Sequence, residues 1–200
     1  MFALLCLFSH MEKELKFIVL GNLGSGKTSI IVRIESDHFV SGEFDVWDDY
    51  YQKTVDLDGK TYRIDILDTH EEEYSALRDQ YIRTADAFFV VYSITDRLSF
   101  EAIPSIIDEV HRVRDETSVP MVLVGNKCDL EDERQVRTEE GSEFAEGMGI
   151  PFFETSAKTR MNLTEALNAI IRTCDDFAIS SVNENNGGRG GGGDKKCLIQ

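Results

Sequence analysis

The chain has 200 residues, 42% of them hydrophobic, which is enough for one domain of ordinary size with a real core and a tail. Its formal net charge of -16 argues against a nucleic-acid-binding protein, which would normally carry a basic face, and disfavours unassisted binding to anionic membranes. The four cysteines match neither a zinc pattern nor a secreted disulfide framework, so we expect a reducing compartment.

Apolar segments with the composition of buried strands alternate with segments of helical periodicity. The expected strands cover residues 15–20, 50–57, 61–67, 87–92, 119–125 and 150–154. The expected helices cover residues 28–36, 74–83, 99–114, 138–148 and 162–178. Asp58-Gly59 joins the second and third strands and is a strong hairpin signal, while Pro104 falls in the first turns of a helix, where proline is tolerated. This order predicts an α/β fold, a mostly parallel six-stranded sheet flanked by helices, which binds ligands at the carboxyl ends of its strands.

The two ends of the chain differ from the middle in composition. Residues 1–10 are apolar, but the run is too short to span a bilayer and lacks the basic start and cleavage site of a secretory signal. We expect residues 1–11 to form an extension outside the fold, and a weak membrane-contacting arm is the alternative. The folded domain is expected over 12–178, followed by a flexible glycine-rich tail over 179–200.

The first strand leads into Gly21-Asn22-Leu23-Gly24-Ser25-Gly26-Lys27-Thr28, which fits the phosphate-binding pattern G-x-x-x-x-G-K-[ST] between a strand and a helix. Its glycines let backbone N–H groups surround a phosphate at the helix N-terminus. Lys27 would contact the β- and γ-phosphates as a catalytic residue, and the Thr28 hydroxyl can ligate Mg²⁺. A glycine turn that happens to precede a lysine is the alternative. The expected phosphate-side residues are Gly24, Ser25, Gly26, Lys27, Thr28 and Ser29.

Two later loops indicate which base is bound. Asn126-Lys127-Cys128-Asp129 and Glu154-Thr155-Ser156-Ala157-Lys158 each follow an expected strand. Together with the phosphate loop they make residues 15–177 resemble a Ras-family small GTPase. The resemblance implies a P-loop NTPase fold that binds GTP and GDP, with the Asp129 carboxylate accepting hydrogen bonds from guanine. It assigns base-side contacts to Phe39, Asn126, Lys127, Asp129, Ser156, Ala157 and Lys158.

Asp68-Thr69 follows the third strand and resembles the start of the family's switch II segment. There Asp68 would hold Mg²⁺ through a water molecule, while Thr28 would ligate it directly. A helix cap or a turn acid is the alternative interpretation of Asp68.

Four departures from the family pattern fall on γ-phosphate sensing or hydrolysis. The switch I threonine that ligates Mg²⁺ is Val46 here, and Leu23 replaces a frequent glycine of the phosphate loop. Switch II is one residue short, so that the glycine that binds the γ-phosphate is missing, and Glu71 stands in place of the water-positioning glutamine. A carboxylate only accepts hydrogen bonds and repels a triphosphate. We therefore expect intact nucleotide binding and slow hydrolysis; the alternative is that His70, Glu71 or Thr69 compensates as a catalytic residue.

The last four residues, Cys197-Leu198-Ile199-Gln200, form a C-a-a-X motif whose final Gln favours farnesylation of Cys197. A single lipid beside so few basic residues anchors marginally and reversibly. The expected location is the cytoplasmic side of the plasma membrane or of an endomembrane. Cys174 lies on the inward stripe of the last helix and is expected in the core rather than at a lipidation site.

The resemblance implies a monomeric switch whose two switch loops are ordered by the γ-phosphate and Mg²⁺ and released on hydrolysis. Its partners would be an exchange factor, a GTPase-activating protein and effectors. The acidic switch loops favour basic surfaces on these partners, and Trp47 would be an apolar anchor. One alternative is a non-hydrolysing scaffold that recruits partners constitutively. A second, an adenine-specific kinase or ATPase, would leave Asp129 without a role.

Overall fold

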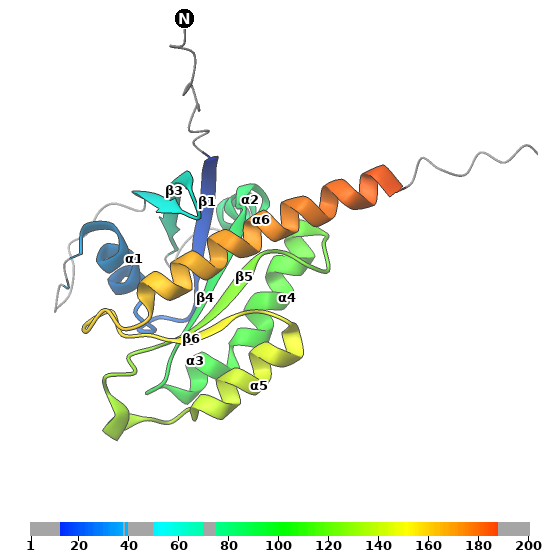
Figure 1. Cartoon of the computed structure of the whole chain (residues 1–200). Coiled ribbons are helices and arrows are strands. Elements are labelled where there is room, and N and C mark those ends of the chain that lie inside the picture. The colour runs from blue at the N-terminus through cyan, green and yellow to red at the C-terminus, as the bar shows by residue number, and fades with distance from the viewer. Residues whose placement is uncertain (1–12, 38, 40–49, 70–74, 188–200) are drawn as a thin grey trace, which may run out of the picture.

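The computed structural model of the chain describes residues 13–37, 39, 50–69 and 75–187, with side chains over 76–180 in the last range. A six-stranded sheet of order β2-β3-β1-β4-β5-β6 forms its centre (Figure 1). Strand β2 pairs with β3 antiparallel, and each other neighbouring pair is parallel. The mostly parallel, helix-flanked sheet expected from the sequence is confirmed.

The strand bounds agree with the expected ones to within two residues. The strands are β1 (Lys13–Leu20), β2 (Tyr50–Leu57), β3 (Lys60–Asp68), β4 (Ala87–Ser93), β5 (Met121–Asn126) and β6 (Phe152–Glu154). Strands β5 and β6 each begin two residues later than expected, directly after Pro120 and Pro151. Proline has no N–H to donate to the ladder, although its carbonyl still accepts from the neighbouring strand.

Helices cover both faces of the sheet. They are α1 (Lys27–Ser36), α2 (Ser75–Thr84), α3 (Arg97–Glu101), α4 (Ile103–Arg114), the short 3₁₀ helix η1 (Glu131–Glu133), α5 (Thr138–Met148) and α6 (Leu163–Gly187). Within the described residues, no helix combines the length and the apolar character needed to cross a membrane.

Two of the expected helices were wrong in extent. The single helix expected over 99–114 is the pair α3 and α4, because Pro104 cannot donate to the carbonyl of Phe100 and so the chain restarts at Ile103. The last helix does not end near 178 but continues to Gly187. No glycine or proline lies between Leu163 and Gly187, and serine and asparagine lower helix propensity only slightly.

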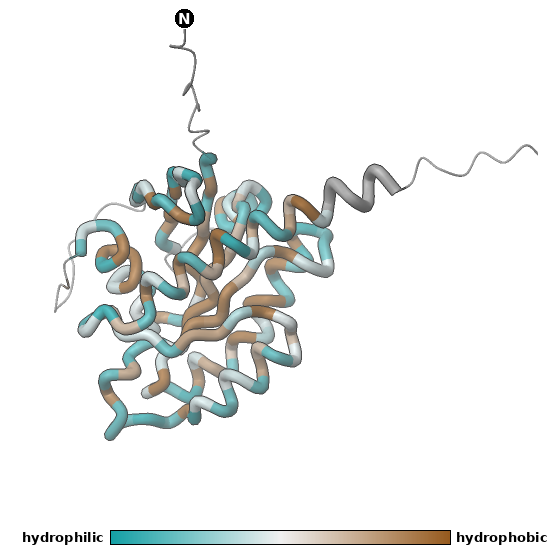
Figure 2. The backbone as a smooth tube through the Cα atoms, viewed as in Figure 1, coloured by the Kyte–Doolittle hydropathy of each residue, from teal (hydrophilic) through white to brown (hydrophobic). Residues whose placement is uncertain are grey.

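Two apolar layers hold the helices to the sheet. Alternate residues of β1 point to opposite faces, so Phe17 packs with α1 and α6, while Ile18 packs with α2 to α5. Figure 2 shows the hydrophobic strands in the middle of the molecule and hydrophilic residues around it. Cys174 lies in the first layer, as expected, and its burial raises the pKa of its thiol to about 12, so the thiol stays protonated.

Candidate nucleotide-binding site

The loop between β1 and α1 has the backbone of a phosphate cradle. Gly26 precedes the first residue of α1 with φ of 92°, a left-handed conformation that glycine adopts without strain. A Cβ at this position would lie 2.3 Å from Nδ2 of Asn126. Lys27 folds over its own loop, and its Nζ donates to the carbonyls of Gly21 at 2.8 Å and Asn22 at 3.2 Å. The ammonium group therefore lies beside the helix N-terminus, where an anion would be bound.

A hydroxyl and a carboxylate meet between the first turn of α1 and the end of β3. Thr28 donates through Oγ1 to Oδ2 of Asp68, whose side chain is buried. Hydroxyl and carboxylate oxygens are the donors that Mg²⁺ prefers, and Mg²⁺ usually takes few protein ligands together with phosphates and water. Among the described residues, no group of three or more His, Cys, Asp or Glu side chains could hold a metal alone. The donor set therefore fits a magnesium ion that is bound jointly with a phosphate.

Asn126, at the end of β5, joins the phosphate loop to the loop after β6 through one buried amide. Its Nδ2 donates to the carbonyl of Ser25 at 3.0 Å. Its Oδ1 accepts from the N–H of Ala157 at 3.3 Å and from the hydroxyl of Thr155 at 3.4 Å. The phosphate loop and the loop after β6 are thus held at a fixed separation.

Asp129 is oriented by the loop after β6. The Ser156 hydroxyl donates to Oδ1 of Asp129 at 2.6 Å and accepts from the N–H of Thr159 at 3.0 Å. The Lys158 ammonium lies 3.9 Å from Oδ2. Ser156 is fully buried, so it positions Asp129 rather than presenting its own side chain at the surface.

A cavity of about 330 Å³ opens between these loops. Phe39, which is 38% exposed, lies on its wall. Eight of the lining residues are ones that the sequence motifs predict to contact the nucleotide. The ninth, Leu130, directly follows Asp129 and adds an apolar wall. The lining residues are Gly26, Ser29, Phe39, Asn126, Lys127, Asp129, Leu130, Ala157 and Lys158.

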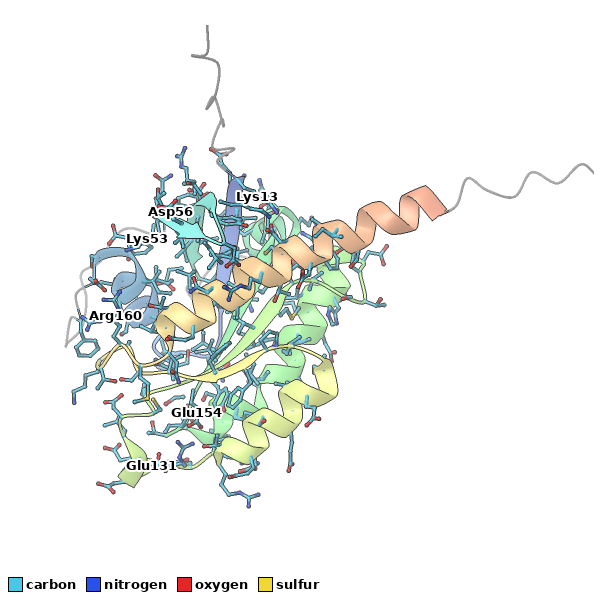
Figure 3. All side chains as sticks on the ribbon, viewed as in Figure 1. Lys13, Lys53, Asp56, Glu131, Glu154 and Arg160 are labelled. Atoms are coloured by element: carbon cyan, nitrogen blue, oxygen red, sulfur yellow. The ribbon has the colours of Figure 1, made fainter. Side chains whose placement is uncertain are left out.

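Arg134 is a structural contributor that the sequence does not signal. Its guanidinium donates to both oxygens of Glu154, at 2.6 and 2.9 Å, and to both oxygens of Glu131. These hydrogen bonds raise the pKa of Arg134 above its ordinary value. Glu154 is the residue before Thr155, so the contact fixes the start of the second base loop against the segment after Asp129. Figure 3 labels the two acceptors, Glu131 on η1 and Glu154 at the end of β6.

Several predicted residues fall outside the described part of the chain. These include Val46 in switch I, Glu71 in switch II and Cys197 in the tail. Leu23 lies within the described residues, and it is 76% exposed.

Comparison with known proteins points to the same family as the motifs. Residues 16–176 match the model of the Ras family. Over 176 residues the chain is 43% identical to the Ras-like protein rasC of Dictyostelium discoideum, a match that covers 87% of this chain and 93% of that protein. The residues that match the family model include every loop that lines the cavity.

Proposed function

This chain belongs to the Ras family of small GTPases, whose members bind GTP and hydrolyse it, and from that membership we propose a signalling switch with an unusual balance of contacts. In this proposal the protein binds guanine and the first two phosphates tightly and contacts the third phosphate weakly. The observation that carries the proposal is the cavity, because its walls unite residues from the phosphate loop, from the loop after β5 and from the loop after β6.

Guanine is selected by hydrogen bonds in this proposal. The Asp129 carboxylate accepts from the N1–H and the exocyclic amine, and the Ala157 N–H donates to the guanine oxygen. Adenine presents the opposite donor and acceptor pattern at these positions, so it leaves the buried partners unpaired, which costs affinity. The Ser156 and Lys158 contacts to Asp129 support this role because they fix the carboxylate before a ligand arrives.

The phosphates occupy the loop at the start of α1. Lys27 would exchange the carbonyls of Gly21 and Asn22 for the β- and γ-phosphates. Thr28 would ligate Mg²⁺ directly and Asp68 would hold it through a water molecule. The bound ion neutralises the negative charge that develops on the phosphates during transfer.

The weak step is recognition of the third phosphate. Val46 offers no oxygen to Mg²⁺, and Glu71 places a negative acceptor where a neutral glutamine would orient water. Leu23 adds bulk at the position where a partner's arginine finger would approach. Intrinsic hydrolysis in the family is already about 10⁻⁴ s⁻¹, so most of the turnover of this protein comes from a GTPase-activating partner.

The location and partners follow from the tail and the switch loops. A farnesyl group on Cys197 tethers the protein reversibly to the cytoplasmic face of the plasma membrane or of an endomembrane. The acidic switch loops favour an exchange factor, an activating protein and effectors with basic surfaces.

The test is a single-turnover assay on full-length protein loaded with GTP, started with Mg²⁺, with and without excess GTPase-activating protein. We expect γ-phosphate release that is slower than about 10⁻⁴ s⁻¹ alone and accelerated by the partner. Lys27→Ala controls for contaminating phosphatase. Unassisted release as fast as this family rate contradicts the weak hold on the third phosphate, and equal affinity for ATP and GTP contradicts the role of Asp129.

A further inference from the structure

A second cavity, of about 270 Å³, lies at the end of the sheet where the parallel strands begin, and the nucleotide cavity lies at the other end, where they finish. The segments that precede β5 and β6 form its floor, and residues 173–180 of α6 form one wall. We call it the α6 groove, and its apolar lining includes Val119, Met148, Ile150 and Phe177. Met148 is 42% exposed, and the exposed residues Thr117 and Ser118 place hydroxyls on the rim. Such a groove suits an extended apolar segment whose backbone needs hydrogen-bond partners at the rim.

The N-terminal strand, β1, begins at this same end of the sheet. Strands β1, β4, β5 and β6 are parallel neighbours, so the start of β1 lies on the side where β5 and β6 begin. Lys13, the first residue of β1, which is labelled in Figure 3, donates from Nζ to Oδ1 of Asp175 on α6 at 2.9 Å. The next two residues, Asp176 and Phe177, line the α6 groove. The chain therefore enters the fold beside the helical turn that forms the groove wall.

The segment upstream of Lys13 has the matching composition. Residues 2–8 are Phe2-Ala3-Leu4-Leu5-Cys6-Leu7-Phe8, without a charged side chain. Strand β5 is two strand spacings from β1, about 10 Å across the sheet. An extended chain covers about 3.5 Å per residue, so Phe8 can reach about 17 Å from Lys13 and the residues before it reach further. Length and exit point both allow the segment to reach the groove.

We infer that residues 2–8 dock into the α6 groove of the same molecule. Apolar side chains on both sides leave water in this arrangement, which favours it over an arm in solvent. Docking within the chain also has the advantage of a high effective concentration, because the connection to Lys13 is short. The occupant is this segment, and a second copy of the chain or a membrane surface would have to compete with it.

Cross-linking from the natural Cys6 tests the inference in full-length protein. A Cys197→Ser background removes the tail thiol, and Met148→Cys places a thiol in the α6 groove. Leu98→Cys is the matched control, since Leu98 is 70% exposed on α3, which follows the carboxyl end of β4 at the other end of the sheet. With a short bismaleimide we expect the cross-link to Cys6 to form at least about tenfold faster with Met148→Cys than with Leu98→Cys. Equal rates, or a cross-linked dimer in place of an intramolecular product, overturn the inference.

Two further measurements test the inference, and the second of them uses no introduced cysteine. Leu4→Asp combined with Leu5→Asp should reduce the Met148→Cys cross-linking rate to that of the Leu98→Cys control. Deletion of residues 2–9 from the natural sequence should accelerate amide hydrogen exchange over 117–121 and 148–151 by about tenfold. Unchanged exchange overturns the docking. Binding of the Cys197→Ser protein to neutral phosphatidylcholine vesicles through residues 2–8, without preferential cross-linking, also overturns it and assigns the segment to membranes.

Discussion

The side-chain amide of Asn126 donates a 3.0 Å hydrogen bond to the backbone carbonyl of Ser25, a residue 101 positions earlier in the chain. The oxygen of the same amide accepts from the N–H of Ala157. Asn126 is 2% exposed, so neither bond competes with bulk water. One side chain therefore couples the loop that faces the phosphates to the loop that faces the base.

Replacing this anchor should loosen both halves of the nucleotide site. Asn126→Ala leaves the Ser25 carbonyl and the Ala157 N–H without their buried partner, a loss of about 1–3 kcal/mol. We expect release of a fluorescent GDP analogue to accelerate by roughly 10- to 100-fold, measured by stopped flow with excess unlabelled GDP. Asn168→Ala on α6 is the matched control and should leave the rate unchanged. If Asn126→Ala released GDP at the natural rate, the coupling role would be wrong.

Val46→Thr tests the assignment of switch I. Threonine restores an oxygen that can ligate Mg²⁺ and contact the γ-phosphate, and a hydrogen bond to a charged group contributes about 1.5–3 kcal/mol. We expect the preference for GTP over GDP in the presence of Mg²⁺ to rise by about tenfold or more, measured by competition titration. Val46→Ala controls for the loss of the valine side chain. An unchanged Mg²⁺-dependent preference would show that position 46 is not the switch I position.

The carboxylate of Asp175 on α6 accepts hydrogen bonds from three side chains near the first residues of β1 and β3. It accepts from Lys13 at 2.9 Å, from Lys60 at 2.7 Å and from the hydroxyl of Tyr62 at 2.7 Å. Burial raises the pKa of this carboxyl, but the three hydrogen bonds outweigh burial and hold its pKa well below the ordinary value. A carboxyl with a depressed folded pKa stabilises the fold fully above its unfolded pKa, about 3.9, and loses this effect as the pH falls through the folded pKa.

Asp175→Asn should therefore destabilise the protein in a pH-dependent way. At pH 7 we expect a loss of about 2 kcal/mol in the free energy of unfolding, measured with urea. The difference in the free energy of unfolding between the two proteins should stay constant from pH 7 to about pH 5. It should become smaller below about pH 4, where the natural carboxyl begins to be protonated in the unfolded chain. Asp176→Asn removes an exposed charge from the same turn and should have little effect. A difference that is independent of pH down to pH 3 would contradict the ionic role of Asp175.

Cys197→Ser tests the lipid anchor. In a eukaryotic host we expect the natural protein to be shared between the membrane and soluble fractions, since one lipid binds only with about 10⁴ M⁻¹. The variant should move to the soluble fraction, as measured by sedimentation and immunoblotting. Cys6→Ser is the matched control and should keep the natural distribution. Membrane association that survives Cys197→Ser would exclude the C-a-a-X motif as the anchor.

Local chemistry in the sequence determined the order of the elements and the cradle for phosphate. Apolar strands that alternate with amphipathic helices leave few arrangements other than a covered parallel sheet, and the positive φ of Gly26 follows from its place before Lys27 in the motif. The helix bounds expected from the sequence were wrong where two local signals compete. Pro104 divided one helix into two, and the absence of helix breakers carried α6 past Ala178 into a polar segment that resembled a linker.

The tertiary structure decided which of the candidate residues act on one another. The pairing of Asn126 with Ser25, of Ser156 with Asp129 and of Arg134 with Glu154 depends on the alignment of strand ends, which sequence spacing does not encode. The wall formed by Leu130 is visible only once the loops surround a cavity. Motifs identify which side chains can bind a nucleotide because that chemistry is local, whereas the contacts that hold those side chains in position join distant segments and exist only in the folded chain.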